Sequence, residues 1–439
     1  MPEVVTVLGV IIGLAFLVIS IYKGLNPPLA SLIAAFIVIA TSGQPFQEAF
    51  DTTITTVGSV IASIGPAIVI GNMMGMVYSA SGVCLSMGKF FTLPCRNIKN
   101  PLLQKVMAVT LFMLARIIIG LSGIDGTSLT VATIALALAI FAEYDISARY
   151  IPAIGAIVIC IGNMMPGIPG VYNLLAVECF EGFTSSSAML PRLLILIIYF
   201  VLSVVVFAAL IKKDVANEVH FVPSTKVTTP DVNDMKLPPW WMGLIPIVLI
   251  FVTYNFCGLE SWSSLALGLA ASVLLFGPYI PKEEGKSRFW SVINQLNVGS
   301  NVFPLQWLFI MLPTMAMSTT GGLDIISNGL SAIGMPALLT LVVLSLVVMG
   351  FGGSQCMPVI AGMMPMMAAA GLSTVGVAMI ALWGSTVFDT LPNSAGVIIS
   401  SDLVDMPMSK SYPVTFYTTV LLTFGITLLV TVFAVMGIF

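Results

Sequence analysis

Charged residues are scarce in this chain of 439 residues, because Asp, Glu, Lys and Arg together make up only 8% of it. Water-soluble domains carry about 25% charged residues. The composition therefore excludes a water-soluble globule. The net charge of −3 is small and carries no information about partners in so apolar a chain, and we expect no nucleic-acid partner.

Residues for metal and redox chemistry are also few. The single histidine, His220, lies in a polar stretch, which excludes a histidine proton relay inside apolar segments. Six cysteines are scattered without a C-x-x-C pair, and four of them lie in or beside apolar segments, namely Cys84, Cys160, Cys257 and Cys356. This pattern indicates free thiols and neither a disulfide framework nor a metal site. We expect no metal and no cofactor.

Catalytic signatures are missing as well. The chain contains no G-x-S-x-G, no H-E-x-x-H and no haem or flavin motif. The tripeptide GKS at 285–287 lacks the upstream glycine of a phosphate-binding loop, so ATP-driven work by this chain is excluded. The sequence predicts that the protein is not an enzyme.

Long apolar segments are what the sequence has in abundance. Hydrophobic residues make up 58% of it, and the mean hydropathy is +1.07. Segments such as 4–22 and 193–211 are long enough to cross a hydrocarbon core of about 30 Å as helices. Segment 4–22 lacks the basic start and cleavage site of a signal peptide, so we expect a retained helix. The fold class predicted is an all-α polytopic membrane protein.

A polar stretch at 212–239 divides the chain and is predicted to be a cytoplasmic linker between two halves, 1–211 and 240–439. The first three helices expected in each half are 4–22, 27–41 and 58–78, and 240–256, 263–280 and 302–318. A polar, interfacial stretch is expected before the third helix of each half, at 287–298 in the second. Each half then continues with a hairpin (about 105–142 and 336–371) and an interrupted helix (about 150–180 and 374–404), and the first half ends on a helix at 190–211.

Short matches in the same order support an internal repeat. TTVGS (55–59) parallels LNVGS (296–300), and SASG (79–82) parallels STTGG (318–322). Further along, GLSG (120–123) parallels GFGG (350–353), and MPGIPGV parallels LPNSAGV. The shared order indicates two structural repeats.

The hairpins decide how the repeats are oriented. Residues 105–142 form two apolar arms of about 16 residues around the polar tip IGLSGIDGTSL (119–129), which is marginal for two full spans. If the hairpin is re-entrant, the first half crosses the membrane five times and the second repeat is inverted. With the N-terminus outside, all basic residues except Arg116 and Arg192 fall on the cytoplasmic side. Both termini are then periplasmic or extracellular, but the charge rule fits re-entrant hairpins and pairs of full spans equally.

Two helix-breaking motifs interrupt apolar segments, MMPGIPGVYN (164–173) and FDTLPNSAGV (388–397). Non-helical backbone is tolerated at membrane depth only within protein or beside a wet cavity. Broken helices at matching positions of two repeats point to the central site of a transporter, where half-helix N-termini can bind an anion and free carbonyls a cation. A plain proline kink is the alternative for each motif taken alone.

Ionisable residues at membrane depth are few, and each is a candidate for function. Asp125 lies at the first hairpin tip and Asp389 just before the second break. A carboxylate in a low-dielectric setting accepts a proton more readily than one in water, so both are candidates for proton coupling. Arg116, about two turns below the first tip, has three interpretations: it pairs with a substrate carboxylate, it neutralises Asp125, or it reaches the cytoplasmic surface.

These motifs resemble those of the gluconate permease family within the ion transporter superfamily, over essentially the whole chain. The family's P-P-x-P-G-P element resembles MPGIPGV here, its G-S-x-T-V-A element resembles GGSQCMPV, and its N-D-S-G element resembles Asn393–Gly396. The chain departs from the family where Gly167 and Val171 replace prolines and Ser394–Ala395 replace Asp-Ser. The resemblance implies proton-coupled uptake of small hydroxy- or amino-carboxylates such as gluconate or D-serine. It also implies a scaffold, a mobile transport domain and a homodimer.

We therefore predict a secondary active transporter of the bacterial inner membrane, an elevator-type symporter of a small organic anion with protons. The residues predicted to line its site are Ser122, Gly123, Thr127, Asn163, Gly167, Gly170, Asn173, Ser354, Gln355, Asn393 and Ser394. Coupling to sodium and sodium/proton antiport are the first alternatives, since both need membrane carboxylates or exposed carbonyls. A passive channel and a membrane-embedded enzyme are alternatives from other classes.

Overall fold

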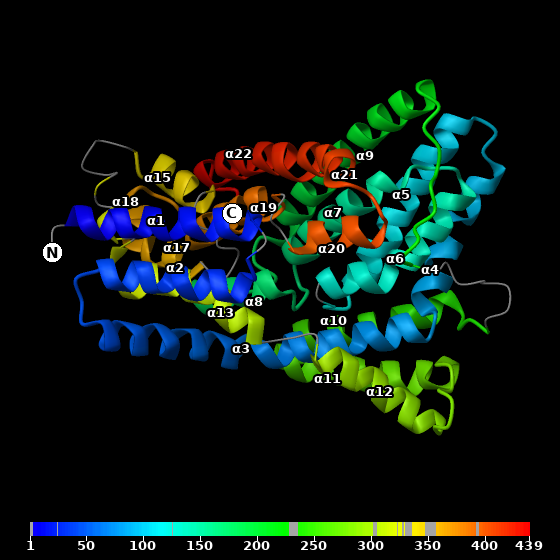
Figure 1. The fold of residues 1–439 in the computed structure, drawn as a ribbon, viewed down its shortest axis with the longest axis horizontal. Coiled ribbons are helices and arrows are strands. Elements are labelled where there is room, and N and C mark those ends of the chain that lie inside the picture. The colour runs from blue at the N-terminus through cyan, green and yellow to red at the C-terminus, as the bar shows by residue number, and fades with distance from the viewer. Residues whose placement is uncertain are drawn as a thin grey trace.

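Figure 1 shows a computed structural model of the chain, which describes residues 3–23, 25–124, 126–227, 236–301, 305–322, 324–326, 329, 336–346, 357–391 and 395–439. Every regular element within these ranges is helical, which confirms the all-α class. Four of the described helices are long and apolar enough to cross a membrane, or five if one bent pair counts as a single span. The structure is therefore compatible with a multi-pass membrane protein.

The first half of the chain folds into nine described helices. They are α1 (Glu3–Tyr22), α2 (Pro27–Thr41), α3 (Phe46–Ala80), α4 (Val83–Thr92), α5 (Pro101–Gly120), α6 (Gly126–Glu143), α7 (Ile151–Met164), α8 (Val171–Cys179) and α9 (Met189–Ala216). Several begin where local chemistry favours a helix start. At α5, for example, the side chain of Asn100 accepts the Leu103 N–H at 3.1 Å, and Pro101 occupies the first helical position, where its missing N–H is not needed.

The second half of the chain is also helical where the structure describes it. Its described helices are α10 (Leu244–Asn255), α11 (Ser261–Phe276), α12 (Arg288–Asn301), α13 (Leu305–Thr319), α15 (Ala337–Leu344), α17 (Met357–Gly362), α18 (Met364–Ala369), α19 (Thr374–Asp389), α20 (Ala395–Leu403), α21 (Met408–Thr415) and α22 (Leu422–Val435). A π-helical segment, Phe416–Leu421, joins α21 to α22. The Ser373 side chain caps α19 by accepting the Gly376 N–H at 2.9 Å.

Helix α3 is longer than the sequence pattern predicts. The polar stretch expected before residue 58 is helical too, so that α3 runs for 35 residues. It is bent by 48° between Phe46–Ala62 and Gly65–Ala80, next to Pro66, whose ring disfavours a straight helix. The sequence separates the two parts by polarity, before residue 58, whereas the bend lies between Ala62 and Gly65.

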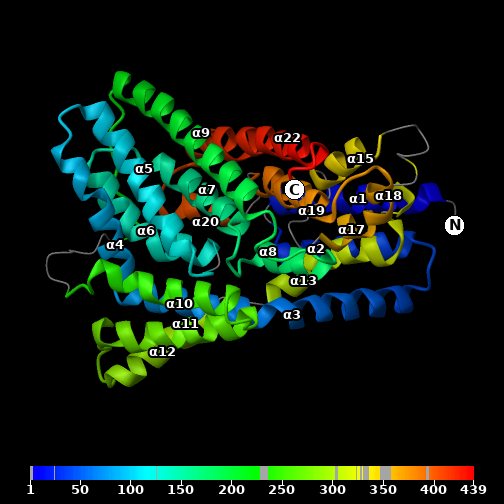
Figure 2. The ribbon, with the colours of Figure 1, turned by 180° about the vertical axis from the view of Figure 1, so that it is seen from behind.

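Helices α12 and α13 run antiparallel to α3 (Figure 2). Near the start of α3, the hydroxyls of Thr53 and Thr319 lie 2.9 Å apart. Toward the end of α3, the backbone of Met73 lies so close to Gly299 that a Cβ at Gly299 would be 2.5 Å from the Met73 Cα. Helix α3 therefore runs in the opposite direction to the two helices that it contacts here, and the contacts involve small residues, as is common between membrane helices.

One face of α9 exposes a continuous apolar stripe. Leu194, Ile197, Val201 and Val205 recur at helical spacing, and each is between 49% and 59% exposed. In water such a stripe would promote aggregation. Surrounded by lipid it is an ordinary outer surface of a membrane helix.

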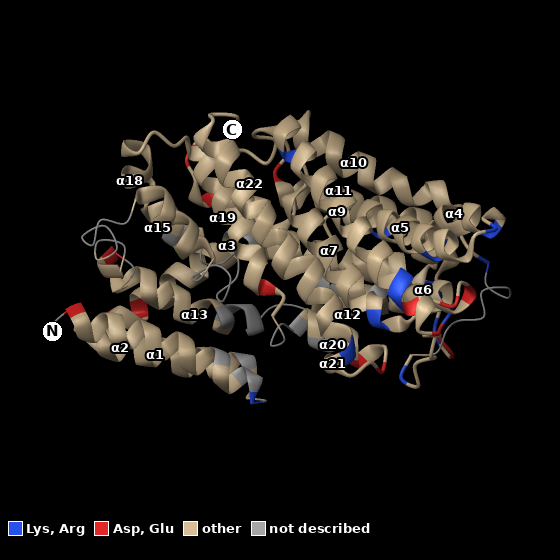
Figure 3. Ribbon diagram, turned by 90° about the horizontal axis from the view of Figure 1, so that it is seen from above, with Lys and Arg blue, Asp and Glu red and all other residues tan. Residues whose placement is uncertain are grey.

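Basic residues are unevenly distributed along the molecule. Figure 3 shows most Lys and Arg gathered toward the end that α4, α5 and α6 form, while acidic residues lie at both ends of the molecule. Figures 1 and 2 place α1 and α2 at the opposite end. The asymmetry is of the kind that the positive-inside rule describes.

The linker after α9 is tied to the base of the first hairpin through Asp145. Its carboxylate accepts the Phe221 N–H at 3.0 Å and the Lys105 ammonium at 3.0 Å, and the Nδ1 of His220 lies 2.9 Å from it. Burial alone would raise the pKa of Asp145, but these donors outweigh it and lower the pKa to about 2. The only histidine of the sequence thus belongs to a surface contact.

The same linker also contacts the end of α20. The carboxylate of Asp405 accepts the N–H and the hydroxyl of Thr225 at 2.5 and 2.6 Å, and Ser224 donates to the Leu403 carbonyl at 2.8 Å. Residues 220–227, which we call the linker clasp, therefore connect the base of the first hairpin to the second half. Elements far apart in sequence are held together at this end.

Replacing Asp145 with alanine is expected to loosen the linker clasp. The side chain of Asp145 is 46% exposed, so after solvent screening its contribution is about 1 kcal/mol. We expect amide hydrogen exchange across residues 219–227 to become on the order of fivefold faster. In the wild type, the folded pKa lies below the ordinary value of 3.8, so the contribution is complete at neutral pH and is lost as pH falls from about 4 toward 2.

The exposed Asp51→Ala variant serves as the control, because the Asp51 side chain bonds only to Gln47 of its own helix among the described contacts. Unchanged exchange in the Asp145 variant would contradict the clasp.

Candidate binding site at the first helix break

The first break follows directly from its prolines and glycines. Helix α7 ends at Met164, and Met165 is extended (ψ 122°), as the residue before a proline must be. Gly167 adopts φ +75°, and a Cβ there would lie 3.0 Å from the Phe251 ring. Glycine is therefore required at that position for conformation and for space. Helix α8 begins again at Val171, and no side chain caps its start.

The carbonyls freed by this break are paired with side chains. The amide of Asn173, fully buried on α8, donates to the Met165 carbonyl at 2.6 Å and to the Ile168 carbonyl at 3.2 Å. From α10, the amide of Asn255 donates to the Gly167 carbonyl at 2.7 Å. Unpaired carbonyls at membrane depth would cost several kcal/mol each. These two asparagines therefore hold the unwound segment in one conformation.

Arg192 supplies the positive charge of the break. It lies in the first turn of α9, is 1% exposed, and donates to the Met164 carbonyl at 2.9 Å and to the Ser185 carbonyl at 2.8 Å. Its guanidinium also bonds to the Asn173 side chain. Within the described residues no carboxylate forms an ion pair with it. A cation at the C-terminal end of α7 is favoured by the helix dipole.

The first hairpin turns beside this break. Gly123 at the tip has φ +77°, and a Cβ there would lie 2.8 Å from the Leu265 side chain of α11. On α3, Gly71 approaches the tip so closely that a Cβ on it would lie 2.6 Å from the Gly123 carbonyl. Glycines on both sides thus permit the hairpin tip to contact α3 directly.

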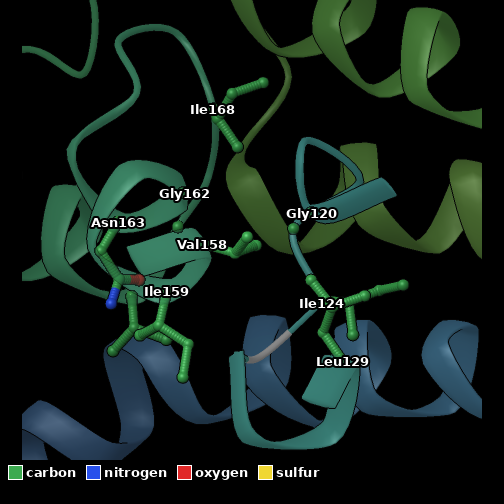
Figure 4. A pocket seen from close by; sticks show the side chains of 11 residues that line it. Gly120, Ile124, Leu129, Val158, Ile159, Gly162, Asn163 and Ile168 are labelled. Atoms are coloured by element: carbon green, nitrogen blue, oxygen red, sulfur yellow. The ribbon is translucent and has the colours of Figure 1, made fainter. Parts of the chain in front are cut away.

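A small cavity separates the hairpin tip from the break (Figure 4). The space inside it that a water-sized molecule can occupy is about 20 Å³. Gly120, Gly123, Ile124 and Leu129 line it from the hairpin, and Val158, Ile159, Gly162, Asn163, Ile168, Gly170 and Val171 line it from the interrupted helix. The two motifs that the sequence singled out in the first half therefore form opposite walls of one cavity.

A hydrogen bond joins the two interrupted helices. The hydroxyl of Tyr172, on α8, donates to the Asp389 carboxylate at the end of α19, at 2.9 Å. The next residue, Thr390, shares a 2.6 Å hydroxyl–hydroxyl bond with Thr419 in the π-helical segment. The end of α19 is thus connected to the first break on one side and to the last helical segments on the other.

The predicted site residues fall into three groups. Gly123, Asn163 and Gly170 line the cavity. Gly167 and Asn173 build the break, and Ser122 donates its hydroxyl to the Ile119 carbonyl of its own helix at 2.6 Å. Five predicted positions lie outside the described residues, as does the side chain of Thr127: Asp125, Ser354, Gln355, Asn393 and Ser394.

Arg116 does not extend to the surface. It is 1% exposed, donates to the Thr130 hydroxyl at 3.0 Å across the hairpin, and its guanidinium lies 5.8 Å from the centre of the Phe112 ring. This overturns the surface-reaching interpretation, because the side chain is enclosed between α5 and α6. It also does not line the cavity.

Sequence reasoning missed Arg192, Asn255 and Tyr172. The sequence analysis names Arg192 only as one of the two basic residues that do not fall on the cytoplasmic side. The feature by which the sequence could have revealed Arg192 is a lone arginine at the start of a long apolar segment, because burying a charge at membrane depth is costly unless the charge has a role. Asn255 and Tyr172 carry no local signal, since their partners lie 88 and 217 residues away.

No protein-family profile matches the chain, and no curated protein matches it. The resemblance to gluconate permeases therefore rests on the motifs alone.

Proposed function

We propose that the protein is a secondary active transporter that takes up a small organic anion with protons. The observation that carries the proposal is the cavity between the first hairpin tip and the first helix break. Its rim includes Gly170 and Val171 at the uncapped start of α8, where N–H groups and the helix dipole favour a carboxylate. Such sites at interrupted helices are typical of transporters.

Inverted repeats and an elevator-type motion belong to the same proposal. The antiparallel contact of α3 with α12 and α13 supports the repeats, because counterpart segments of inverted repeats run in opposite directions. The hydrogen bond between Tyr172 and Asp389 supports the proposal that both interrupted helices belong to one moving unit. The arms α5 and α6, with 20 and 18 residues, exceed the expected 16, so their length does not separate a re-entrant hairpin from two spans.

Protons are favoured over sodium as the coupling ion at the first break. Sodium sites in interrupted helices use free backbone carbonyls. Here the carbonyls of Met164, Met165, Gly167 and Ile168 already accept side-chain N–H groups, and the Arg192 guanidinium lies among them. A second cation would meet few free ligands and a positive charge.

The first test is a thermal-shift screen of the purified protein with hydroxy acids, sugar acids and amino acids, with and without sodium. A ligand at a hundred times its dissociation constant adds about 2.7 kcal/mol of stability. Stabilisation by a carboxylate without sodium would support the proposal. Stabilisation by sodium alone would support a sodium/proton antiporter, and concentrative uptake into proteoliposomes separates either transporter from a passive channel.

Replacing Asn163 with alanine is expected to weaken the binding of the carboxylate at least tenfold. Asn163 is the polar side chain of the described cavity wall, and a hydrogen bond to a charged group contributes about 1.5–3 kcal/mol. The dissociation constant from the thermal-shift titration measures the effect. The exposed Asn97→Ala variant is the matched control, and equal affinity in both variants would remove Asn163 from the site.

A further inference from the structure

The loop between α8 and α9, residues 180–188, lies directly against the first break. Its Ser185 carbonyl accepts the Gly167 N–H at 3.0 Å and the Arg192 guanidinium at 2.8 Å. One neutral oxygen of this loop therefore occupies two donors, an N–H group of the unwound backbone and a buried cation. We call residues 180–188 the α8–α9 loop.

Asn255 fastens both this loop and the break to α10. Its side-chain oxygen accepts the Ser186 hydroxyl at 2.8 Å, while its amide donates to the Gly167 carbonyl at 2.7 Å. One turn earlier on α10, the Phe251 ring lies so close to Gly167 that a Cβ there would be 3.0 Å away. The bond between Ser186 and Asn255 thus connects the loop to a helix of the second half, and it is separate from the contacts that shape the break.

The α8–α9 loop is a compact unit. Within it, the Ser187 hydroxyl accepts the Thr184 N–H at 2.9 Å and lies 3.1 Å from the Thr184 hydroxyl. Phe183 is 3% exposed, and the Arg192 guanidinium lies 5.7 Å from the centre of its ring. Internal bonds preserve the shape of such a loop when it moves, and burial of Phe183 makes the closed position the more stable one.

The backbone at both ends of this unit has the properties of a hinge. Gly182 has φ +77°, and a Cβ there would meet no atom within 4 Å. Ala188, directly before α9, has φ +48°, a conformation that is unfavourable for a residue with a Cβ. Hinges of lids are typically a few loop or helix-end residues of this kind, because these absorb the change in φ and ψ.

Movement of the loop would change what the break offers to a ligand. When the Ser185 carbonyl leaves, the Gly167 N–H and an N–H group of Arg192 lose their acceptor, and both then attract a negatively charged group. In the orientation that the basic residues predict, Arg192 and hence this loop lie on the outer side. The loop is therefore placed where access to the break from outside would be closed.

We propose that the α8–α9 loop is an outer lid that opens about Gly182 and Ala188, and that the bond between Ser186 and Asn255 is its latch. The purpose of the lid rests on the proposed transport function, because a transporter opens its site to one side at a time. Its opening can be measured without any substrate.

Ser186→Ala removes the latch and leaves the bond between Asn255 and the Gly167 carbonyl in place. Loss of a hydrogen bond between neutral groups is expected to make lid opening about fivefold more frequent. Hydrogen exchange of segment 165–170, followed by mass spectrometry of the full-length protein in detergent, measures the opening, because the Gly167 N–H exchanges when the Ser185 carbonyl leaves. We expect about fivefold faster exchange and an unchanged melting temperature.

An introduced thiol provides an independent measurement. The side chain of Ser185 is 6% exposed, so the thiol of the Ser185→Cys variant is shielded while the lid is closed. A membrane-impermeant maleimide added outside whole cells is expected to label this variant in excess of the parent protein, and about fivefold faster when Ser186→Ala is also present. Labelling that requires access from the inside would overturn the outer position of the lid.

Ser187→Ala is the matched control, because among the described contacts its hydroxyl bonds only to Thr184 of the same loop. Exchange of segment 165–170 in this variant is expected to match that of the wild type. Unchanged exchange in Ser186→Ala, or an equal increase in Ser187→Ala, would overturn the lid.

The outcomes separate this inference from the function on which it rests. If the lid opens as described but the protein neither binds nor takes up any carboxylate, the transporter is overturned and the lid stands. If a carboxylate is taken up but Ser186→Ala leaves the Gly167 exchange unchanged, the lid alone is overturned.

Discussion

The Arg192→Met variant is expected to lose about 3 kcal/mol of stability and to lose transport. Methionine fills a similar volume but donates no hydrogen bond, so the Met164 and Ser185 carbonyls lose donors at 2.9 and 2.8 Å. Each charge-assisted bond contributes about 2 kcal/mol, and removing a buried, desolvated charge offsets part of the loss. The melting temperature in detergent is expected to fall by ~5 °C.

Two further variants make this result interpretable. Arg192→Lys keeps the charge but lacks the planar fork, so it is expected to retain only part of the stability. The control Arg96→Met removes a side chain that is 59% exposed and paired with Glu143, and such surface pairs contribute less than about 1 kcal/mol. Equal melting temperatures for the Arg192→Met and Arg96→Met variants would contradict the role of Arg192 in the break.

The Asp389→Asn variant is expected to lose accumulation driven by a pH gradient while downhill exchange of the substrate continues. Asparagine has almost the same shape and still accepts a hydrogen bond from Tyr172, but it cannot take up and release a proton. Proteoliposomes with an imposed pH gradient measure the accumulation ratio, which is expected to approach one. Exchange at equal pH inside and outside measures whether the site itself is intact.

A second substitution separates the role of the Asp389 charge from that of its hydrogen bond with Tyr172. Tyr172→Phe removes the 2.9 Å bond between the interrupted helices but leaves the Asp389 carboxylate free to ionise, so accumulation is expected to persist at a reduced rate. Asp51→Asn, an exposed position on α3, is the matched control. Wild-type accumulation by Asp389→Asn would show that this residue carries no proton.

The two predictions concern different aspects of one arrangement. Arg192 fixes the shape of the first break, and Asp389 connects that break to the second interrupted helix through Tyr172. If both predictions hold, the rigid break and its buried Arg192 guanidinium would favour an anion in the cavity, and the Asp389 carboxylate would couple uptake to a proton. If Arg192→Met lost stability but kept accumulation, and Asp389→Asn lost accumulation but kept stability, the two residues would have separate roles.

The sequence predicts the helices well, because membrane depth makes hydropathy and backbone pairing strong local constraints. Helices α1, α2, α7 and α9 begin or end within a few residues of the expected bounds. The break at 165–170 follows from two prolines and two glycines that, so close together, disfavour a continuous helix. Helix α3 was the exception, since its polar first part is helical through packing against α13 and not through its own hydropathy.

Tertiary structure alone decided which groups meet. The sequence determined that the chain is all-α, where its helices are interrupted, and that the hairpin tip at 119–129 and the break carry unusual residues. It could not show that these two form one cavity, that Arg192 and Asn255 pair with the freed carbonyls, or that Tyr172 contacts Asp389. The physical reason is the range of the interactions: helix formation and helix breaking depend on neighbours within a few residues, whereas a buried polar group finds its partner only when distant helices pack.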